Sequence, residues 1–254
     1  MGSRKKNKGG LQVLYGYHCI YHAFHSDRRR IHQLFIQEGQ KVHRLHEIVE
    51  LAKIKSIPIA YQPRTELQRR CGSPNHQGVV GEAAAFPLST VEDLLKHRGD
   101  ERPACILALD GIQDPRNLGS IIRSAHVLGV DGIIIPKDRS CGLTPAVARV
   151  SEGALEYSRI SQVVNFAREM RAMKKQGFWL IGMHTHGGEL PDSVDLKGDT
   201  IIILGGEDRG IRRIVMEQCD QIITIPIGGP VGSLNASNAM SILLYEVDRQ
   251  RRNR

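Results

Sequence analysis

The amino-acid sequence predicts an α/β protein with a small mixed unit in its first third and a larger parallel sheet after it. After residue 103, five continuous apolar runs recur, at 104–110, 132–136, 178–183, 200–205 and 222–226. Amphipathic segments lie between these runs, and uninterrupted apolar strands that alternate with helices are typical of a parallel sheet covered on both faces. The chain has 254 residues, which is enough for a small domain and a medium one.

The first third of the chain is predicted to be a basic tail followed by a small α/β domain. Residues 1–10 are polar and contain glycine, which predicts a disordered tail. Within residues 11–86, the apolar spacing over 45–52 indicates a helix. The other elements expected there are a strand over 57–62, a helix over 65–70 and a strand within 76–86. Residues 87–103 begin and end with proline and are interpreted as a linker containing one short helical turn.

Residues 104–254 form the predicted second domain, and apolar stripes indicate its helices over 118–128 and 163–175. Near its end, an apolar run leads into a glycine-rich loop over 227–234, then Asn235 and an amphipathic helix. A strand, a glycine loop and a helix in this order direct backbone N–H groups and a positive helix end toward the loop. This loop is therefore a candidate ligand site.

The charge of the chain is unevenly distributed. Residues 1–85 hold 14 Lys and Arg against 6 Asp and Glu, whereas residues 86–254 hold 21 of each, so the net charge of +8 lies in the first third. This asymmetry indicates that one part binds a polyanion, most simply nucleic acid, while another part does the chemistry. No apolar run has the length of a membrane span, and the five cysteines are scattered, so we expect a cytoplasmic protein with reduced thiols and no membrane association.

The first of three polar loops runs from Asp110 into the helix that contains Arg123. Asn117 is interpreted as the N-cap of this helix, its side chain accepting a hydrogen bond from a free backbone N–H. Arg123 lies one residue off the apolar stripe, so it is expected to face outward. Taken alone, a capped helix with a solvated arginine would explain this segment equally well.

The second loop follows another apolar run and places Gly205 and Gly206 directly before Glu207. Glycines at a strand end let a ligand approach the backbone closely. The Gly-Lys-Ser/Thr ending of a P-loop is missing, and no G-x-G-x-x-G follows the first long strand, which disfavours a Walker NTPase and a dinucleotide site. A structural turn would also account for this loop by itself.

Two further groups of side chains are weaker candidates. His184 and His186 stand two residues apart at a strand end, but no third ligand is evident, so no metal site is expected. The aromatic residues Tyr15, Tyr17, Tyr21 and Phe24 are candidates for stacking on unpaired bases, although core packing is the interpretation favoured for most of them.

Three motifs in this order resemble a known family. DPRNLGSIIRSA (114–125), GGEDRGI (205–211) and IPIGGPVGSLNASNAMS (225–241) look like the motifs of the SpoU (TrmH-type) ribose 2′-O-methyltransferases of the SPOUT superfamily. The first part of the chain, from YGYHCIYHAF to HQGVVGEAAAF, resembles the substrate-binding domain of the 23S rRNA guanosine-2′-O-methyltransferases in this family.

The resemblance implies a trefoil-knotted methyltransferase domain with an L30e-like RNA-binding domain before it, an S-adenosylmethionine cofactor and a homodimer with its active site near the subunit interface. It also implies methyl transfer to the ribose 2′-OH of a guanosine in 23S rRNA. A tRNA substrate is the alternative, which the separate first domain disfavours. A non-catalytic RNA-binding ribosome-assembly factor is a third hypothesis, which the intact motifs oppose.

The resemblance also transfers roles to individual positions. The catalytic candidates that it implies are Asn117, Arg123, Glu207, Ser233 and Asn235. The positions expected to contact the cofactor through their backbone are Gly205, Ile225 and Leu234.

Arg123 is the family's candidate for activating the ribose hydroxyl, which is a very weak acid. A free guanidinium has a pKa above ~12, so general-base action by Arg123 needs a strongly perturbed environment. In the alternative mechanism Arg123 holds the adjacent phosphate and aligns the hydroxyl, while the proton leaves to water. Both mechanisms stay open at this point.

Overall fold

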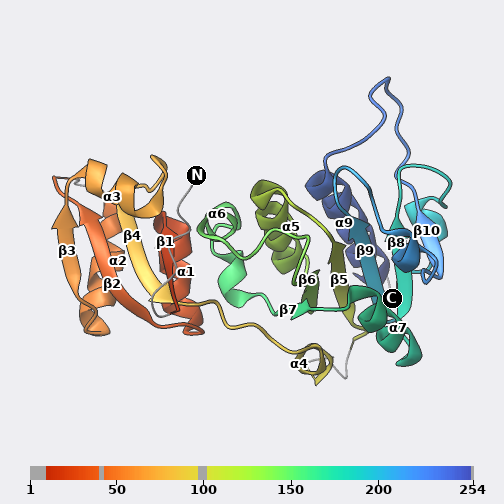
Figure 1. Cartoon of the computed structure of the whole chain (residues 1–254), viewed down its shortest axis with the longest axis horizontal. Coiled ribbons are helices and arrows are strands. Elements are labelled where there is room, and N and C mark those ends of the chain that lie inside the picture. The colour runs from red at the N-terminus through yellow and green to blue at the C-terminus, as the bar shows by residue number, and fades with distance from the viewer. Residues whose placement is uncertain (1–9, 40–42, 97–101, 253–254) are drawn as a thin grey trace. The chain divides into compact units, whose positions relative to one another are not determined.

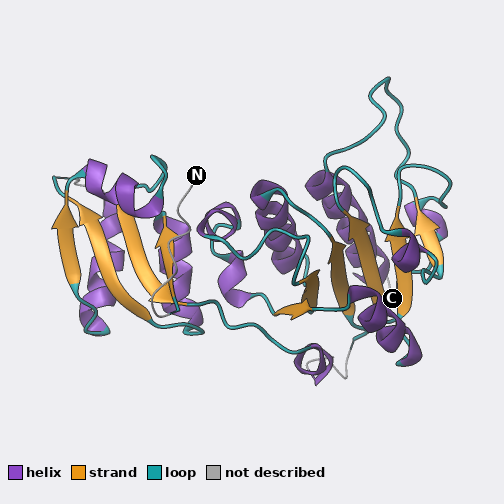
Figure 2. Cartoon of the chain, viewed as in Figure 1, coloured by secondary structure: helices purple, strands orange, loops and turns teal. Residues whose placement is uncertain are grey.

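The computed structural model describes residues 10–39, 43–96 and 102–252. Contacts divide the chain into two compact units, one comprising Met1–Pro87 and Leu143–Tyr157, the other Leu88–Gly142 and Ser158–Arg254. Each unit has its own sheet (Figures 1 and 2). The predicted disordered tail lies outside the described residues apart from Gly10, and so do residues 97–101 of the predicted linker.

The first unit contains a four-stranded mixed sheet in the order β1-β4-β2-β3. β4 runs antiparallel to β1 and β2, whereas β3 runs parallel to β2. Its elements are β1 (Leu11–Tyr15), α1 (Tyr17–Ser26), β2 (Ile31–Gln37), α2 (His43–Ile54), β3 (Ile59–Gln62), α3 (Arg64–Cys71), β4 (Val79–Ala84), α6 (Pro145–Val150) and the 3₁₀ helix η1 (Ala154–Tyr157). The helices and strands that the sequence predicts between residues 45 and 86 are confirmed.

The segment 143–157 joins the first unit, although it follows the predicted domain boundary by about forty residues. Its Glu156 accepts a hydrogen bond of 2.9 Å from Nε of Arg29, and both side chains are buried. Gly153 has a positive φ of 93°, and a Cβ there would collide with the ring of His22. Because the buried charges neutralise each other, removing one of them would destabilise the unit by roughly 3–5 kcal/mol.

The second unit contains a six-stranded sheet in the order β10-β8-β9-β5-β6-β7, and every pairing in it is parallel. This confirms the predicted parallel sheet. The elements are α4 (Val91–Lys96), β5 (Cys105–Asp110), α5 (Pro115–Val127), β6 (Gly132–Pro136), β7 (Ile160–Val163), α7 (Phe166–Lys175), β8 (Trp179–Met183), η2 (Pro191–Ser193), β9 (Thr200–Gly205), α8 (Arg213–Met216), β10 (Gln221–Ile223) and α9 (Ala236–Arg252). The sequence did not predict β7, and the strand expected over 222–226 ends at Ile223.

Helices cover both faces of this sheet (Figure 1). Side chains of α4, α7 and α8, including Leu94, Met170 and Val215, form one buried cluster with alternate strand residues. α5 and α9 lie side by side on the opposite face, where Ser124 and Ser241 share a hydrogen bond of 2.8 Å. Because all strands are parallel, the carboxyl ends of β5, β8, β9 and β10 meet at one edge of the sheet.

All five cysteines are free thiols, and burial raises the pKa of Cys19 to about 12 and that of Cys105 to about 11. Within the ranges that the structure describes, no helix combines the length and the apolar character needed to cross a bilayer.

Candidate functional site

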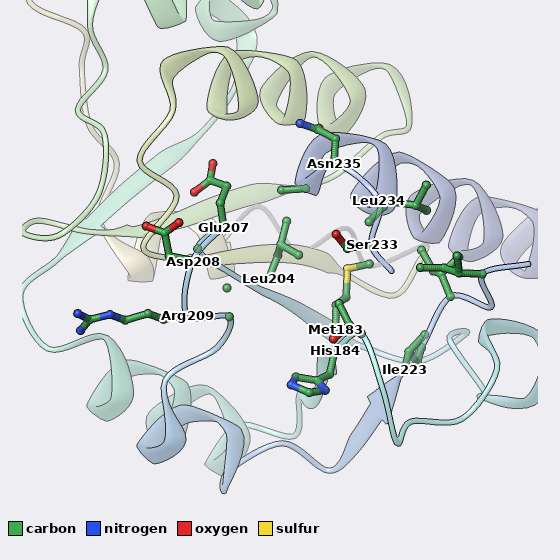
Figure 3. Close-up of a pocket in the computed structure, with 18 residues that line it drawn as sticks. Met183, His184, Leu204, Glu207, Asp208, Arg209, Ile223, Ser233, Leu234 and Asn235 are labelled. Carbon is green, nitrogen blue, oxygen red and sulfur yellow. The ribbon is translucent and has the colours of Figure 1, made fainter. Parts of the chain in front are cut away.

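A pocket of about 640 Å³ opens at the carboxyl edge of the second unit's sheet (Figure 3). Its walls come from residues 183–185 after β8, residues 204–210 at the end of β9, and the segment that joins β10 to α9. Met183, Leu204 and Ile223 supply apolar surface, whereas Glu207 and Asn235 supply polar groups. The pocket therefore combines an apolar interior with a small number of orienting polar groups, as small-molecule sites do.

The loop after β9, residues 205–211, folds back tightly on its own backbone. The N–H of Gly210 donates to the carbonyl of Gly206 at 2.9 Å. A Cβ at Gly205 would collide with the backbone of Gly210 and Ile211, so only glycine fits at this position. The fold-back turns the backbone of this loop toward the pocket.

Asp110 anchors this loop at both ends. Its carbonyl accepts from the N–H of Gly206 at 3.1 Å. Its carboxylate, 1% exposed, accepts from the backbone N–H of Arg212 at 3.0 Å and from Nε of Arg212 at 2.8 Å. Asp110 therefore holds both ends of the loop that carries Glu207, one through its backbone carbonyl and the other through its buried carboxylate.

Replacing this carboxylate tests the anchor directly. Asp110→Asn is expected to lower the free energy of unfolding by roughly 1.5–3 kcal/mol, because the guanidinium of Arg212 loses a charged acceptor. Hydrogen exchange at the backbone N–H of Arg212 should become faster as well. Asp138→Asn, which changes an exposed carboxylate in the same unit, should alter stability by no more than about 0.5 kcal/mol. Equal stability of the two variants would contradict the anchoring role.

A chain of hydrogen bonds joins three of the residues that the sequence singled out. Nδ2 of Asn117 donates to Oε1 of Glu207 at 2.7 Å, and Nδ2 of Asn235 donates to Oδ1 of Asn117 at 2.9 Å. Oδ1 of Asn235 in turn accepts from the backbone N–H of Ser237 at 2.9 Å. This polar relay of Glu207, Asn117, Asn235 and Ser237 links the loop after β9 to the starts of α5 and α9.

The interpretation of Asn117 as an N-cap is wrong. Asp114 caps α5, its carboxylate accepting from the N–H of Arg116 at 2.8 Å, and Pro115 fills the first helical position. Asn117 is buried in the first turn, where its amide can serve the relay. Asn235 caps α9 through its hydrogen bond with Ser237, whereas Ser233 lies three residues before this helix and lines the pocket.

The other site residues from the sequence divide into two groups. Gly205, Ile225 and Leu234 all line the pocket, together with Ser233. Arg123 is exposed on α5, as expected, about 9 Å along the helix axis from Asn117. It does not line the pocket, so a ligand must extend beyond the pocket to meet it.

Sequence reasoning missed several pocket residues, among them Met183, Thr185, Asp208 and Arg209. Met183 and Thr185 could be found only from their position at the end of an apolar run, whereas Asp208 and Arg209 lie within the second motif, GGEDRGI. His184, considered above as half of a metal pair, also lines the pocket, and its Nδ1 lies 2.9 Å from the carbonyl oxygen of His186. In the described part of the chain no three His, Cys, Asp or Glu residues are grouped so that they could hold a metal ion.

Comparison with known proteins gives consistent matches over both units. Residues 104–245 match the SpoU rRNA Methylase family, and residues 13–89 match a domain described as RNA 2′-O ribose methyltransferase substrate binding. The chain is 40% identical over 244 residues to the 23S rRNA (guanosine-2′-O-)-methyltransferase RlmB of Coxiella burnetii, covering 95% of this chain and 96% of that protein. The RlmB of Shewanella oneidensis is 37% identical over 240 residues, with 94% and 98% covered.

The fold is shared with solved structures. The SpoU methyltransferase AviRb from Streptomyces viridochromogenes, in complex with AdoMet, superposes with a TM-score of 0.80 at 24% sequence identity. The superposition covers 96% of this chain and 92% of that chain.

Proposed function

We propose, because the chain belongs to the SpoU rRNA methylase family, that it transfers a methyl group from S-adenosylmethionine to the ribose 2′-OH of a guanosine in 23S rRNA. The observation that carries the proposal is the relay from Glu207 through Asn117 to Asn235 at the rim of the pocket. It connects all three motif loops through side chains. The activity named for the Coxiella and Shewanella relatives, which match nearly the whole chain, supports the same reaction.

The pocket fits an adenosyl cofactor. Its volume of about 640 Å³ lies within the range of about 300–1,000 Å³ that holds small-molecule cofactors. Glycine at position 205 lets the loop after β9 fold back closely and form one wall of the pocket, and Ile225 and Leu234 line the same pocket. We assign these three positions to cofactor binding. When bound, S-adenosylmethionine supplies an electrophilic methyl group on a sulfonium.

The chain's own residues would position the substrate. The relay fixes the carboxylate of Glu207, whose second oxygen accepts from the N–H of Gln113 at 3.4 Å. Ser233 and Asn235 face the same rim and can orient the ribose (Figure 3). Arg123 would grip the phosphate next to the target ribose and align its 2′-OH, because a guanidinium binds phosphate through two parallel hydrogen bonds. General-base action is the alternative mechanism, and it needs Arg123 as a deprotonated guanidine.

We assign substrate selection to residues 11–86 and methyl transfer to residues 104–254, with 87–103 as the linker between them. The match of residues 13–89 to a substrate-binding domain and the excess of basic residues in the first third support this division. We also assign the protein to the cytoplasm, which its similarity to bacterial rRNA methyltransferases supports.

The exposed apolar side chains of α5 and α9 support a homodimer, which is also part of the proposal. Ile242 and Tyr245 of α9 are 44% and 56% exposed, and Val127 of α5 is 73% exposed. A second copy of the chain would remove such apolar side chains from water. This surface lies on the two helices that also carry relay residues, which supports an active site near the subunit interface.

Mapping of 2′-O-methylation across rRNA and tRNA, in cells with and without this protein, tests the proposed function. We expect one guanosine of 23S rRNA to lose its mark and to regain it when the wild-type chain is restored. Loss of a mark in tRNA, with rRNA unchanged, would reassign the substrate. Unchanged marks in both would point to a non-catalytic RNA-binding factor.

A further inference from the structure

The outward face of α1 in the first unit is made of aromatic rings. The inward face packs into the core through Cys19, Ile20, Ala23 and Phe24. The rings on the other side are partly or fully exposed, and they are Tyr17, His18, Tyr21, His22 and His25. Of the aromatic residues considered from the sequence, Tyr15 and Phe24 are thus core residues at 7% and 4% exposure, whereas Tyr17 and Tyr21 are not.

Three of the exposed rings form a continuous column along the helix. The ring centroids of Tyr17 and Tyr21 are 5.5 Å apart with an interplanar angle of 22°. Those of Tyr21 and His25 are 4.1 Å apart with an angle of 31°. Residues four apart lie on the same side of a helix, so the column runs from the first turn of α1 to the last. Mutual packing holds the ring planes in place and reduces the entropy that is lost when another ring stacks on them.

The surroundings of this column favour an anionic ligand. The hydroxyl of Tyr17 donates to Oε2 of Glu47 at 2.7 Å. Burial and this hydrogen bond raise the pKa of Tyr17 to about 12, so the phenol is neutral at physiological pH. Arg44, exposed on α2, places a positive charge nearby, and this charge by itself lowers the pKa of Tyr17.

The carboxylate at the far end of the column is paired with a lysine. Asp27 directly follows α1, and Nζ of Lys55 donates to it at 2.8 Å. Residues 1–85 carry an excess of basic over acidic side chains, 14 against 6, so the part of the chain that contains the column has a net positive charge. Aromatic rings in a positive field are the combination that proteins use to bind single-stranded nucleic acid.

We propose that the aromatic face of α1 binds unpaired RNA bases, with a base stacked on the exposed His25 end of the column formed by Tyr17, Tyr21 and His25. The inference rests on the proposed function, because it names the part of the rRNA substrate that the first unit holds. Every base has a π-face, so stacking of this kind recognises an unpaired loop and not a nucleotide identity.

The test compares two double variants of the full chain. The leucine pair, Tyr21→Leu with His25→Leu, removes both aromatic rings and keeps apolar bulk. The phenylalanine pair, Tyr21→Phe with His25→Phe, keeps an aromatic ring at each position but removes the polar groups of tyrosine and histidine. Binding is measured by fluorescence anisotropy with a labelled RNA hairpin that has an unpaired loop and with the fully paired duplex of the same stem. Circular dichroism and cooperative thermal unfolding verify that each variant is folded.

We expect the leucine pair to weaken hairpin binding about tenfold or more, since stacking of one base contributes that much. Its duplex affinity should stay within about twofold of wild type. The phenylalanine pair should bind the hairpin as the wild type does. Wild-type hairpin affinity in the leucine pair would overturn the proposal, and so would an equal loss for hairpin and duplex.

Failure of this inference is distinguishable from failure of the proposed function. If wild-type protein modifies 23S rRNA and the leucine pair does so with unchanged hairpin affinity, only the role of α1 is refuted. If no methylation mark depends on the protein and the leucine pair still loses hairpin affinity selectively, the enzymatic function fails while base stacking on α1 stands.

Discussion

Arg123→Lys is expected to abolish nearly all methyl transfer while leaving AdoMet affinity unchanged. Lysine keeps the positive charge but loses the planar fork that holds a phosphate through two hydrogen bonds. Arg123 is exposed on α5 and does not line the pocket. The substitution should therefore leave the shape of the cofactor site unchanged. Single-turnover methylation of the 23S rRNA target should fall by about a hundredfold or more, which is the range lost with a group that assists proton transfer or alignment.

The matched control for this experiment is Arg168→Lys, which makes the same exchange at an exposed position of α7 on the opposite face of the sheet. Its methylation rate should equal that of the wild type. Near-wild-type turnover in Arg123→Lys would refute both the base and the alignment mechanism. Loss of AdoMet affinity in that variant would instead place Arg123 in the cofactor site.

Gly205→Ala is expected to remove cofactor binding through one added methyl group. A Cβ at Gly205 would collide with the backbone of Gly210 and Ile211, where no flexible side chain can yield. The loop must open, which displaces the pocket wall and Glu207 together. Overpacking of this kind lowers the free energy of unfolding by roughly 1–3 kcal/mol. Isothermal titration with AdoMet and thermal unfolding measure the two effects.

Gly198→Ala provides the matched control for Gly205→Ala. Gly198 stands before the other end of β9, and a Cβ there would meet no atom within 4 Å. AdoMet affinity should therefore remain that of the wild type. Wild-type affinity in Gly205→Ala would show that the fold-back of residues 205–211 is not needed for the cofactor.

Most of the larger sheet could be predicted from the sequence, because a strand that is buried on both faces must be apolar throughout. β5, β6 and β9 therefore coincide with uninterrupted apolar runs. β7 escaped prediction because it is four residues long and contains Ser161 and Gln162. Such a short edge strand is defined by its pairing with β6 and not by its own composition.

The grouping of segment 143–157 with the first unit could not be predicted. It depends on the buried pair of Arg29 and Glu156, which are 127 positions apart, and on the close approach of His22 to Gly153. A charged residue in a sequence gives no sign that it will be buried, since only a partner contributed by the fold makes burial of the charge tolerable.

The sequence by itself determined the fold class, the family and the set of motif residues, because these depend on apolar periodicity and on local residue order. Only the tertiary structure decided how those residues act together. Glu207 and Asn117 are 90 positions apart, and Asn117 and Asn235 are 118 apart, yet their side chains share hydrogen bonds. Parallel strands bring the loops that carry these residues to one edge of the sheet, and such long-range proximity is not encoded in any local pattern.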